Sequence, residues 1–172
     1  VEIETPAGKI AAWRLGEGPA VLLVHGWQDD NSLWSPLISA LAEIGVASVV
    51  FDLPGHGFSE GETCAPSRAA EALQEVAAQL GPIDAVVTHS FGGPVVGFAL
   101  LNGFAPRRIA LIGTYTPRKC GIATFGTDVF EKFAEFHPNI RVDIYALDDP
   151  KAPLSYEGIA GTIAYDDPAA YE

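Results

Sequence analysis

The sequence predicts an α/β fold, in which a mostly parallel β-sheet carries helices on both faces. Short apolar runs without alternation, such as Ala20-Val21-Leu22-Leu23-Val24, are typical of strands that are buried on both sides. These runs alternate with longer helical patterns, and such alternation builds parallel sheets. No Ser/Gly-rich or Pro-rich linker divides the 172 residues, so we expect residues 1–172 to form a single domain.

The first part of the chain is predicted to begin with a hairpin formed by 1–4 and 10–15. Strands are then expected over 20–24, 46–51 and 83–88. Helices are expected over 33–44, 67–80 and 93–103. Asn31 or Ser32 is the expected cap of the first helix, and Gly45 is expected to end it.

The last third continues the same alternation. Strands are expected over 108–114, 141–147 and 159–165, with a helix over 122–136 between the first two. The βα units of this part therefore extend the parallel sheet.

Charge and composition narrow the range of partners and compartments. The net charge of −12 should repel phosphate backbones and anionic lipids, so we expect neither nucleic acid nor membrane as a partner. No uncharged apolar run reaches the length of a membrane span, and residues 1–4 lack the pattern of a signal peptide, so a cytoplasmic location is expected.

Cysteine usage gives no sign of a metal site. Cys64 and Cys120 lie far apart and have no zinc-ligand spacing, so no metal is expected. They fit a reducing compartment, although a disulfide between them stays open.

The strongest chemical signal is Thr88-His89-Ser90-Phe91-Gly92, which lies between a predicted buried strand and a predicted helix. A tight turn at this place exposes the hydroxyl of its central serine, and small residues are needed two positions before and after it. Gly92 meets this need, whereas Thr88 is bulkier than the usual glycine. Ser90 is therefore the predicted nucleophile, and the N–H of Phe91 a predicted oxyanion donor.

A second motif, His25-Gly26-Trp27, follows the strand over 20–24. The N–H of Trp27 is the predicted second oxyanion donor, and His25 is expected to order the loop by hydrogen bonding rather than to act as a base. The turn-rich loop over 52–59 is interpreted as structural, including His56.

Together these segments resemble the α/β-hydrolase family from residue 1 to about residue 108. The resemblance implies a three-layer sandwich, here truncated and without a cap domain. It also implies serine acyl transfer on a small carboxylic ester, with no cofactor. In that family an acid follows a later strand, and a histidine lies near the C-terminus.

Residues from about 109 to 172 resemble a different family instead. The stretch from Ile109 to Phe125 is similar to the N-terminal part of GT-B glycosyltransferases, most specifically in Pro-Arg-Lys-Cys-Gly-Ile-Ala-Thr-Phe. Val142 to Asp149 and Ile163 to Pro168 are similar to that family as well. The sequence thus suggests a chimera with a junction near Arg107-Arg108, in which the second part continues the same sheet. Transferase activity is not expected, because the domain that binds most of the donor in that family has no counterpart here.

A serine nucleophile needs a base and an acid to orient that base. Of the four histidines, His137 is the candidate base, although a surface or helix-end role is the simpler interpretation. Asp148 is the candidate acid, with Asp149 as its alternative, since both follow a predicted strand. The last predicted strand ends in Asp166-Asp167 where the family resemblance implies a histidine.

These observations predict a weak serine hydrolase that forms an acyl-enzyme on Ser90. The alternatives are a non-catalytic chimeric scaffold and a domain that binds a small ligand without chemistry. A homodimer is also possible, because an uncovered edge strand is adhesive.

Overall fold

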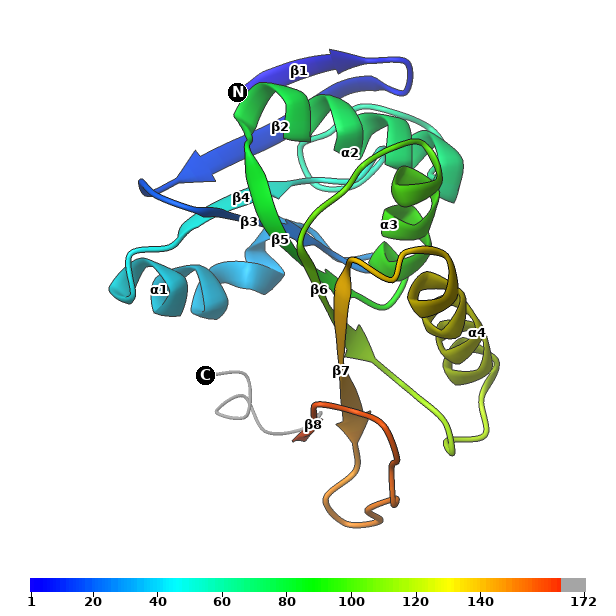
Figure 1. The fold of residues 1–172 in the computed structure, drawn as a ribbon. Helices are drawn as coiled ribbons and strands as arrows, with labels where there is room; N and C mark the ends of the chain where they lie inside the picture. Colours follow the sequence, from blue (N-terminus) through cyan, green and yellow to red (C-terminus); the bar gives the residue numbers. More distant parts are fainter. Residues whose placement is uncertain (165–172) are drawn as a thin grey trace.

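The computed structural model describes residues 1–164, which form an eight-stranded sheet with the strand order β1-β2-β4-β3-β5-β6-β7-β8 (Figure 1). The strands are β1 (Glu2–Thr5), β2 (Gly8–Leu15), β3 (Ala20–Val24), β4 (Ala47–Phe51), β5 (Ile83–His89), β6 (Arg108–Gly113), β7 (Arg141–Asp148) and β8 (Gly161–Ala164). Pairing is antiparallel from β1 to β2 and from β2 to β4, and parallel between all the others. The predicted mostly parallel sheet is confirmed.

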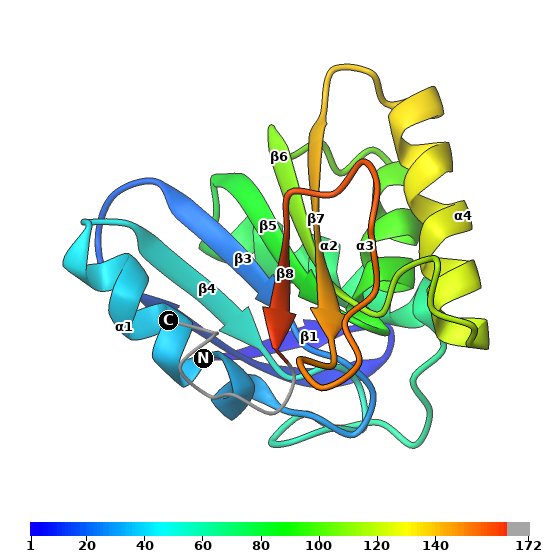
Figure 2. The same cartoon turned by 90° about the horizontal axis from the view of Figure 1, so that it is seen from below.

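Helices cover both faces of this sheet, as predicted (Figures 1 and 2). They are α1 (Ser35–Glu43), α2 (Pro66–Leu80), α3 (Gly92–Leu101) and α4 (Gly121–Phe136), and a short 3-10 helix, η1 (Asn31–Trp34), precedes α1. α1 packs on one face through a small cluster around Leu23, Trp34 and Val50. The other three helices bury the larger core, so the molecule is a three-layer sandwich.

The large core explains why the sequences of the central strands are continuous apolar runs. All five residues of β4 are buried, and so are Leu22, Leu23 and Val24 of β3, because helices press on both sides of these strands. Both motifs found in the sequence lie at the carboxyl ends of adjacent strands, β3 and β5, since these two strands are paired in parallel. The order of the strands therefore brings the motifs together.

The connection from β6 to β7 contains α4 but no cap domain. β6 pairs in parallel with β5, and β7 with β6 over six residues, from Arg108↔Arg141 to Gly113↔Ala146. The sheet thus continues without interruption across the proposed junction at 107–108. β8 is the outermost described strand on this side, and the suggested homodimer stays a prediction.

Most expected element boundaries shift by one or two residues, and two of the differences have an identifiable cause or limit. The cap is Asp30, whose carboxylate accepts the N–H of Ser32 at 2.8 Å, and it begins the 3-10 helix rather than α1. The side chain of Asn31 instead binds Asp52 in the next loop, a long-range contact that the local pattern does not reveal. The expected strand over 159–165 begins at Gly161, while Tyr165 and the Asp166-Asp167 pair lie outside the described residues.

Candidate active site

Ser90 occupies the sharp turn between β5 and α3. Its φ of 49° is in the left-handed region, which residues with a side chain rarely adopt. Two backbone hydrogen bonds hold the turn: the N–H of Ser90 donates to the carbonyl of Ile112 at 3.0 Å, and the N–H of Gly93 donates to the carbonyl of Ser90 at 3.0 Å. A strained backbone held from both sides in this way is typical of functional turns.

Close backbone packing explains the glycine two positions after the serine. A Cβ on Gly92 would lie 2.4 Å from Oγ1 of Thr88, 2.6 Å from the carbonyl oxygen of Val24 and 2.9 Å from that of His25. The end of β3 therefore presses directly on the start of α3. Only glycine fits at this position without a shift of the backbone.

Thr88 occupies the position where the motif usually has glycine, and the structure accommodates it at a cost. The residue is fully buried, and within residues 1–164 its Oγ1 has no hydrogen-bond partner. A buried hydroxyl without a partner costs roughly 1–3 kcal/mol. The bulkier residue is thus tolerated in the turn, but its polar atom makes no compensating contact with the described part of the chain.

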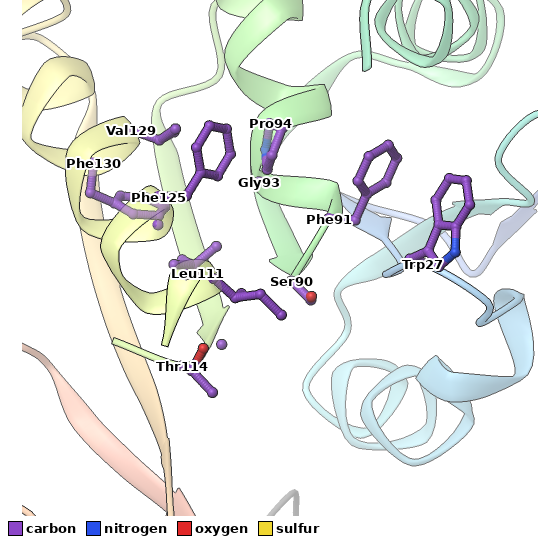
Figure 3. Close-up of a pocket in the computed structure, with 14 residues that line it drawn as sticks. Trp27, Ser90, Phe91, Gly93, Pro94, Leu111, Thr114, Phe125, Val129 and Phe130 are labelled. Carbon is purple, nitrogen blue, oxygen red and sulfur yellow. The ribbon is translucent and has the colours of Figure 1, made fainter. Parts of the chain in front are cut away.

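A pocket of about 400 Å³ opens beside Ser90 (Figure 3). Its walls are mostly apolar and come from α3, the end of β6, the start of α4 and the loop after β3. The residues that line it are Trp27, Ser90, Phe91, Gly93, Pro94, Leu111, Gly113, Thr114, Gly121, Ile122, Phe125, Gly126, Val129 and Phe130. In Figure 3, Ser90 lies between the side chains of α4 on one side and those of Phe91 and Trp27 on the other.

The two predicted oxyanion donors belong to segments that touch each other. Phe91 precedes α3, and Trp27 follows the end of β3. Their rings meet edge to face with centroids 5.2 Å apart. Gly26 allows this approach, because a Cβ there would lie 2.9 Å from Nδ1 of His89 and 3.3 Å from Cβ of Ser90. The loop after β3 is therefore packed against the serine turn.

His25 orders this loop, as its sequence context predicted. The N–H of Leu53 donates to Nε2 of His25 at 2.9 Å, so Nδ1 carries the proton and donates to the carbonyl of Gly26 at 2.8 Å. The ring is completely buried, and this burial lowers the pKa of His25 below its ordinary value. Both nitrogens are engaged by the backbone, so His25 is a structural link between β3 and the loop after β4.

The neutral state of His25 predicts a loss of stability in acid. Below about pH 6.5 the unfolded chain protonates this histidine while the folded chain does not, so the free energy of unfolding falls as the pH falls. The slope contributed by one such ring is at most about 1.4 kcal/mol per pH unit, and the decline stops once the folded ring also titrates. Burial lowers the pKa of His89 as well, which adds an effect of the same sign. Urea unfolding between pH 7.5 and 5.5 measures the slope, and a His25→Asn variant with the wild-type slope would contradict this origin.

The loop over 52–59 has the structural role that the sequence suggested. The buried carboxylate of Asp52 accepts the N–H of Asn31 at 2.7 Å and the N–H of Phe58 at 2.8 Å. The hydroxyl of Ser59 donates to the carbonyl of Asp52 at 2.6 Å. His56 packs on the ring of Trp27, with centroids 5.4 Å apart, and its Nδ1 lies 3.0 Å from the carbonyl of Pro54.

The structure does not bring His137, the candidate base, to Ser90. His137 caps the C-terminal end of α4, just before β7 begins, whereas Ser90 follows the carboxyl end of β5. Since β5, β6 and β7 are parallel, His137 lies at the amino ends of these strands and Ser90 at their carboxyl ends, on opposite sides of the sheet. The 16 residues of α4 span about 24 Å between those two sides.

Asp148, the candidate acid, lies at the carboxyl ends of the parallel strands, as Ser90 does. It is buried at the end of β7, two strands from β5, which corresponds to roughly 10 Å. Its carboxylate already accepts two hydrogen bonds, from the hydroxyl of Tyr156 at 3.1 Å and from the N–H of Leu154 at 3.2 Å. Asp149 instead accepts the N–H of Lys151 at 2.9 Å in the following turn.

The sequence analysis missed a histidine–carboxylate pair next to the serine. Nδ1 of His89 lies 3.3 Å from Oδ2 of Asp29, which belongs to the loop after β3. Asp29 stands two residues after the His25-Gly26-Trp27 motif, but its approach to His89 depends on the pairing of β3 with β5. The pair faces β3, on the side of Ser90 that is opposite to Asp148.

Nothing in residues 1–164 suggests a metal site or a disulfide. No group of three or more His, Cys, Asp or Glu side chains converges there in a way that could hold a metal ion. Cys64 and Cys120 are both free thiols in the structure, so the disulfide that the sequence left open is not formed there.

The family model described as "Alpha/beta hydrolase family" matches residues 21–170. The chain belongs to the alpha/beta hydrolase family. This match crosses residue 108 and extends through β6, α4, β7 and β8, so the interpretation of residues 109–172 as a glycosyltransferase segment, and of the chain as a chimera, finds no support. The local resemblance around Arg118 and Cys120 reflects a strand–loop–helix unit that many α/β families share.

Among known alpha/beta hydrolases, a pimeloyl-acyl-carrier-protein methyl ester esterase from Xanthomonas campestris pv. campestris is 36% identical over 104 residues, which are 60% of this chain and 40% of that relative. An esterase structure from Exiguobacterium antarcticum covers 80% of this chain and 56% of its own, with a TM-score of 0.60 and 24% identity. An epoxide hydrolase from an endophytic Streptomyces covers 69% of this chain and 38% of its own, with a TM-score of 0.57 and 30% identity. The chain thus matches less than half the length of the curated relative.

Within residues 1–164, no helix is long and apolar enough to cross a membrane.

Proposed function

We propose that the chain is a hydrolase of small carboxylic esters with Ser90 as its nucleophile. The observation that carries the proposal is the position of Ser90, which is held at a φ of 49° where β5 ends and lines an apolar pocket. The similarity to a known methyl ester esterase supports the same type of substrate. No cofactor is required for this chemistry.

In the proposed reaction, Oγ of Ser90 attacks the ester carbonyl and its proton leaves to solvent. The tetrahedral oxyanion accepts hydrogen bonds from the backbone N–H groups of Phe91 and Trp27. The start of α3 adds the positive end of a helix dipole beside Phe91. Collapse of the intermediate expels the alcohol and leaves an acyl group on Ser90, which water then removes as the carboxylic acid.

Turnover is expected to be weak. Asp148 is the proposed acid because it lies at the carboxyl ends of the parallel strands, as Ser90 does, yet in residues 1–164 no histidine stands between the two. His137 has no role in this proposal, since it lies at the amino ends of these strands. An oxyanion hole and substrate binding alone give about 10³- to 10⁴-fold catalysis over water. Activated esters should therefore react, and unactivated ones should react poorly.

The gap between Ser90 and Asp148 also favours a second candidate function. An apolar pocket of about 400 Å³ whose described lining contains no histidine is suited to bind a small acyl ligand without chemistry. In that case the ligand should raise the melting temperature, while Ser90 should stay unmodified by reactive probes.

Labelling with a fluorophosphonate distinguishes the two functions. We expect one phosphonyl group per chain, located on Ser90 by peptide mass spectrometry and absent from Ser90→Ala. Ser39→Ala is the matched control, because Ser39 is an exposed helical serine whose hydroxyl bonds only to the carbonyl of Ser35. Equal labelling of wild type and Ser90→Ala would refute the nucleophile, and no labelling together with ligand-induced stabilisation would favour the binding function.

A further inference from the structure

One wall of the pocket beside Ser90 belongs to α4. Phe125, Val129 and Phe130 of this helix face Leu111 of β6 and Pro94 of α3 across the cavity (Figure 3). None of these side chains carries a hydrogen-bonding group. Beyond the hydroxyl of Ser90, the labelled walls offer an oxygen only at Thr114, which lies at the end of β6 (Figure 3).

The mouth of the pocket is apolar as well. Trp27, Ile122 and Phe125 are 53%, 61% and 52% exposed, and all three line the cavity. Large apolar side chains that stay in water around a cavity are typical of a binding site for an apolar group. Their position next to the proposed nucleophile indicates which group this is, because whatever enters the pocket must place its reactive carbon at Ser90.

We infer that the pocket between α3 and α4 binds an unbranched, uncharged acyl chain of medium length, and that α4 sets the length that fits. This inference rests on the proposed function for its ester carbonyl, but the affinity of the pocket for alkyl chains is a separate property. At about 30 Å³ per small atom group, the cavity of about 400 Å³ holds roughly a dozen such groups. Once the ester oxygens and the start of the alcohol are counted among these groups, acyl chains of about six to ten carbons fill the rest, with the carbonyl at Ser90.

Gly126 is the position on α4 from which this length can be changed. It lies in the wall of the pocket, and a Cβ built on it meets only the carbonyl oxygen of Thr114, at an ordinary contact distance of 3.6 Å. A larger side chain there has room to extend into the cavity rather than into the protein. Replacement of a helical glycine also favours the helix itself, so the variant should fold.

The test compares wild type, Gly126→Ala and Gly126→Leu with p-nitrophenyl esters from acetate to decanoate. In wild type, kcat/KM should rise by up to about fourfold per added methylene and reach its maximum near eight carbons. Gly126→Leu adds four carbons to the wall, so its maximum should move to about four carbons. Gly126→Ala is the matched control, with the same gain in helix propensity and little change in cavity volume.

Binding of straight-chain alcohols from butanol to decanol, followed by thermal shift in wild type and in Gly126→Leu, separates this inference from the proposed function. If no ester is hydrolysed but longer alcohols stabilise wild type and not Gly126→Leu, the pocket assignment holds and the hydrolase proposal fails. If esters are hydrolysed with no dependence on chain length, or Gly126→Leu keeps the wild-type profile, α4 does not form the acyl site and the inference is overturned.

Discussion

Replacement of Ser90 by alanine should lower the hydrolysis of p-nitrophenyl butyrate by about 10- to 100-fold. A hydroxyl held beside the bound carbonyl attacks with a large advantage over water, because its orientation is fixed before the reaction begins. The oxyanion donors proposed at Phe91 and Trp27 remain in the variant, so a small residual rate should persist. Initial rates of the purified proteins, corrected for spontaneous hydrolysis, give the ratio.

The Ser90→Gly variant separates the role of the hydroxyl in the reaction from the effect of residue 90 on the stability of the turn. Glycine adopts a positive φ freely, whereas serine at 49° carries a strain of roughly 1–2 kcal/mol. The glycine variant should therefore be as inactive as Ser90→Ala, yet more resistant to urea than wild type by about 1 kcal/mol. Wild-type rates in both variants would exclude Ser90 as the nucleophile and leave the binding function.

The order and type of the elements could be read from the sequence because the central strands are buried on both faces. A strand buried on both faces needs apolar residues at successive positions, as in β3 and β4. Such a continuous apolar run is recognisable in a short stretch of sequence. The serine turn could be predicted because its motif and the strand before it are local in the sequence, although two of the three contacts that require Gly92 come from the end of β3. A motif of this kind carries its own structural context.

The missing parts of the site depend on contacts between segments that are distant in sequence. The approach of Asp29 to His89 follows from the parallel pairing of β3 and β5, which no local window contains. The position of His137 could be predicted only from the order and direction of the strands. A residue at the C-terminal end of α4 lies at the amino ends of the parallel strands, whereas Ser90 lies at their carboxyl ends. For the same reason, the contribution of α4 to the pocket could not be predicted.

The glycosyltransferase interpretation shows how a short resemblance misleads. Its evidence was concentrated between Thr116 and Phe125, a loop and the first turn of α4, and many α/β families build this unit in the same way. The family match over residues 21–170 and the uninterrupted pairing of β5, β6 and β7 are global properties. They outweigh a resemblance that is specific only from Pro117 to Phe125.

Gly92→Ala should destabilise the fold by about 3 kcal/mol, or a decrease of roughly 6–12 °C in melting temperature. The new methyl group would lie 2.4 Å from Oγ1 of Thr88 and within 3 Å of the carbonyl oxygens of Val24 and His25. Two of these three contacts are with backbone, which cannot rotate away as a side chain can. The strain should push β3 and α3 apart at the site itself, and urea unfolding measures the loss.

Gly93→Ala, one position further along α3, is the matched control. Its Cβ would meet only Cδ1 of Leu111, at 3.2 Å, and a leucine side chain can yield, so its stability should stay within about 1 kcal/mol of wild type. Thr88→Gly combined with Gly92→Ala then identifies the cause of the effect. Removal of the threonine side chain relieves one of the three contacts, so it should restore only a minor part of the lost stability. Full recovery would show that Thr88, rather than the carbonyls at the end of β3, imposes the glycine, and wild-type stability of Gly92→Ala itself would show that the turn is looser than the packing around Ser90 implies.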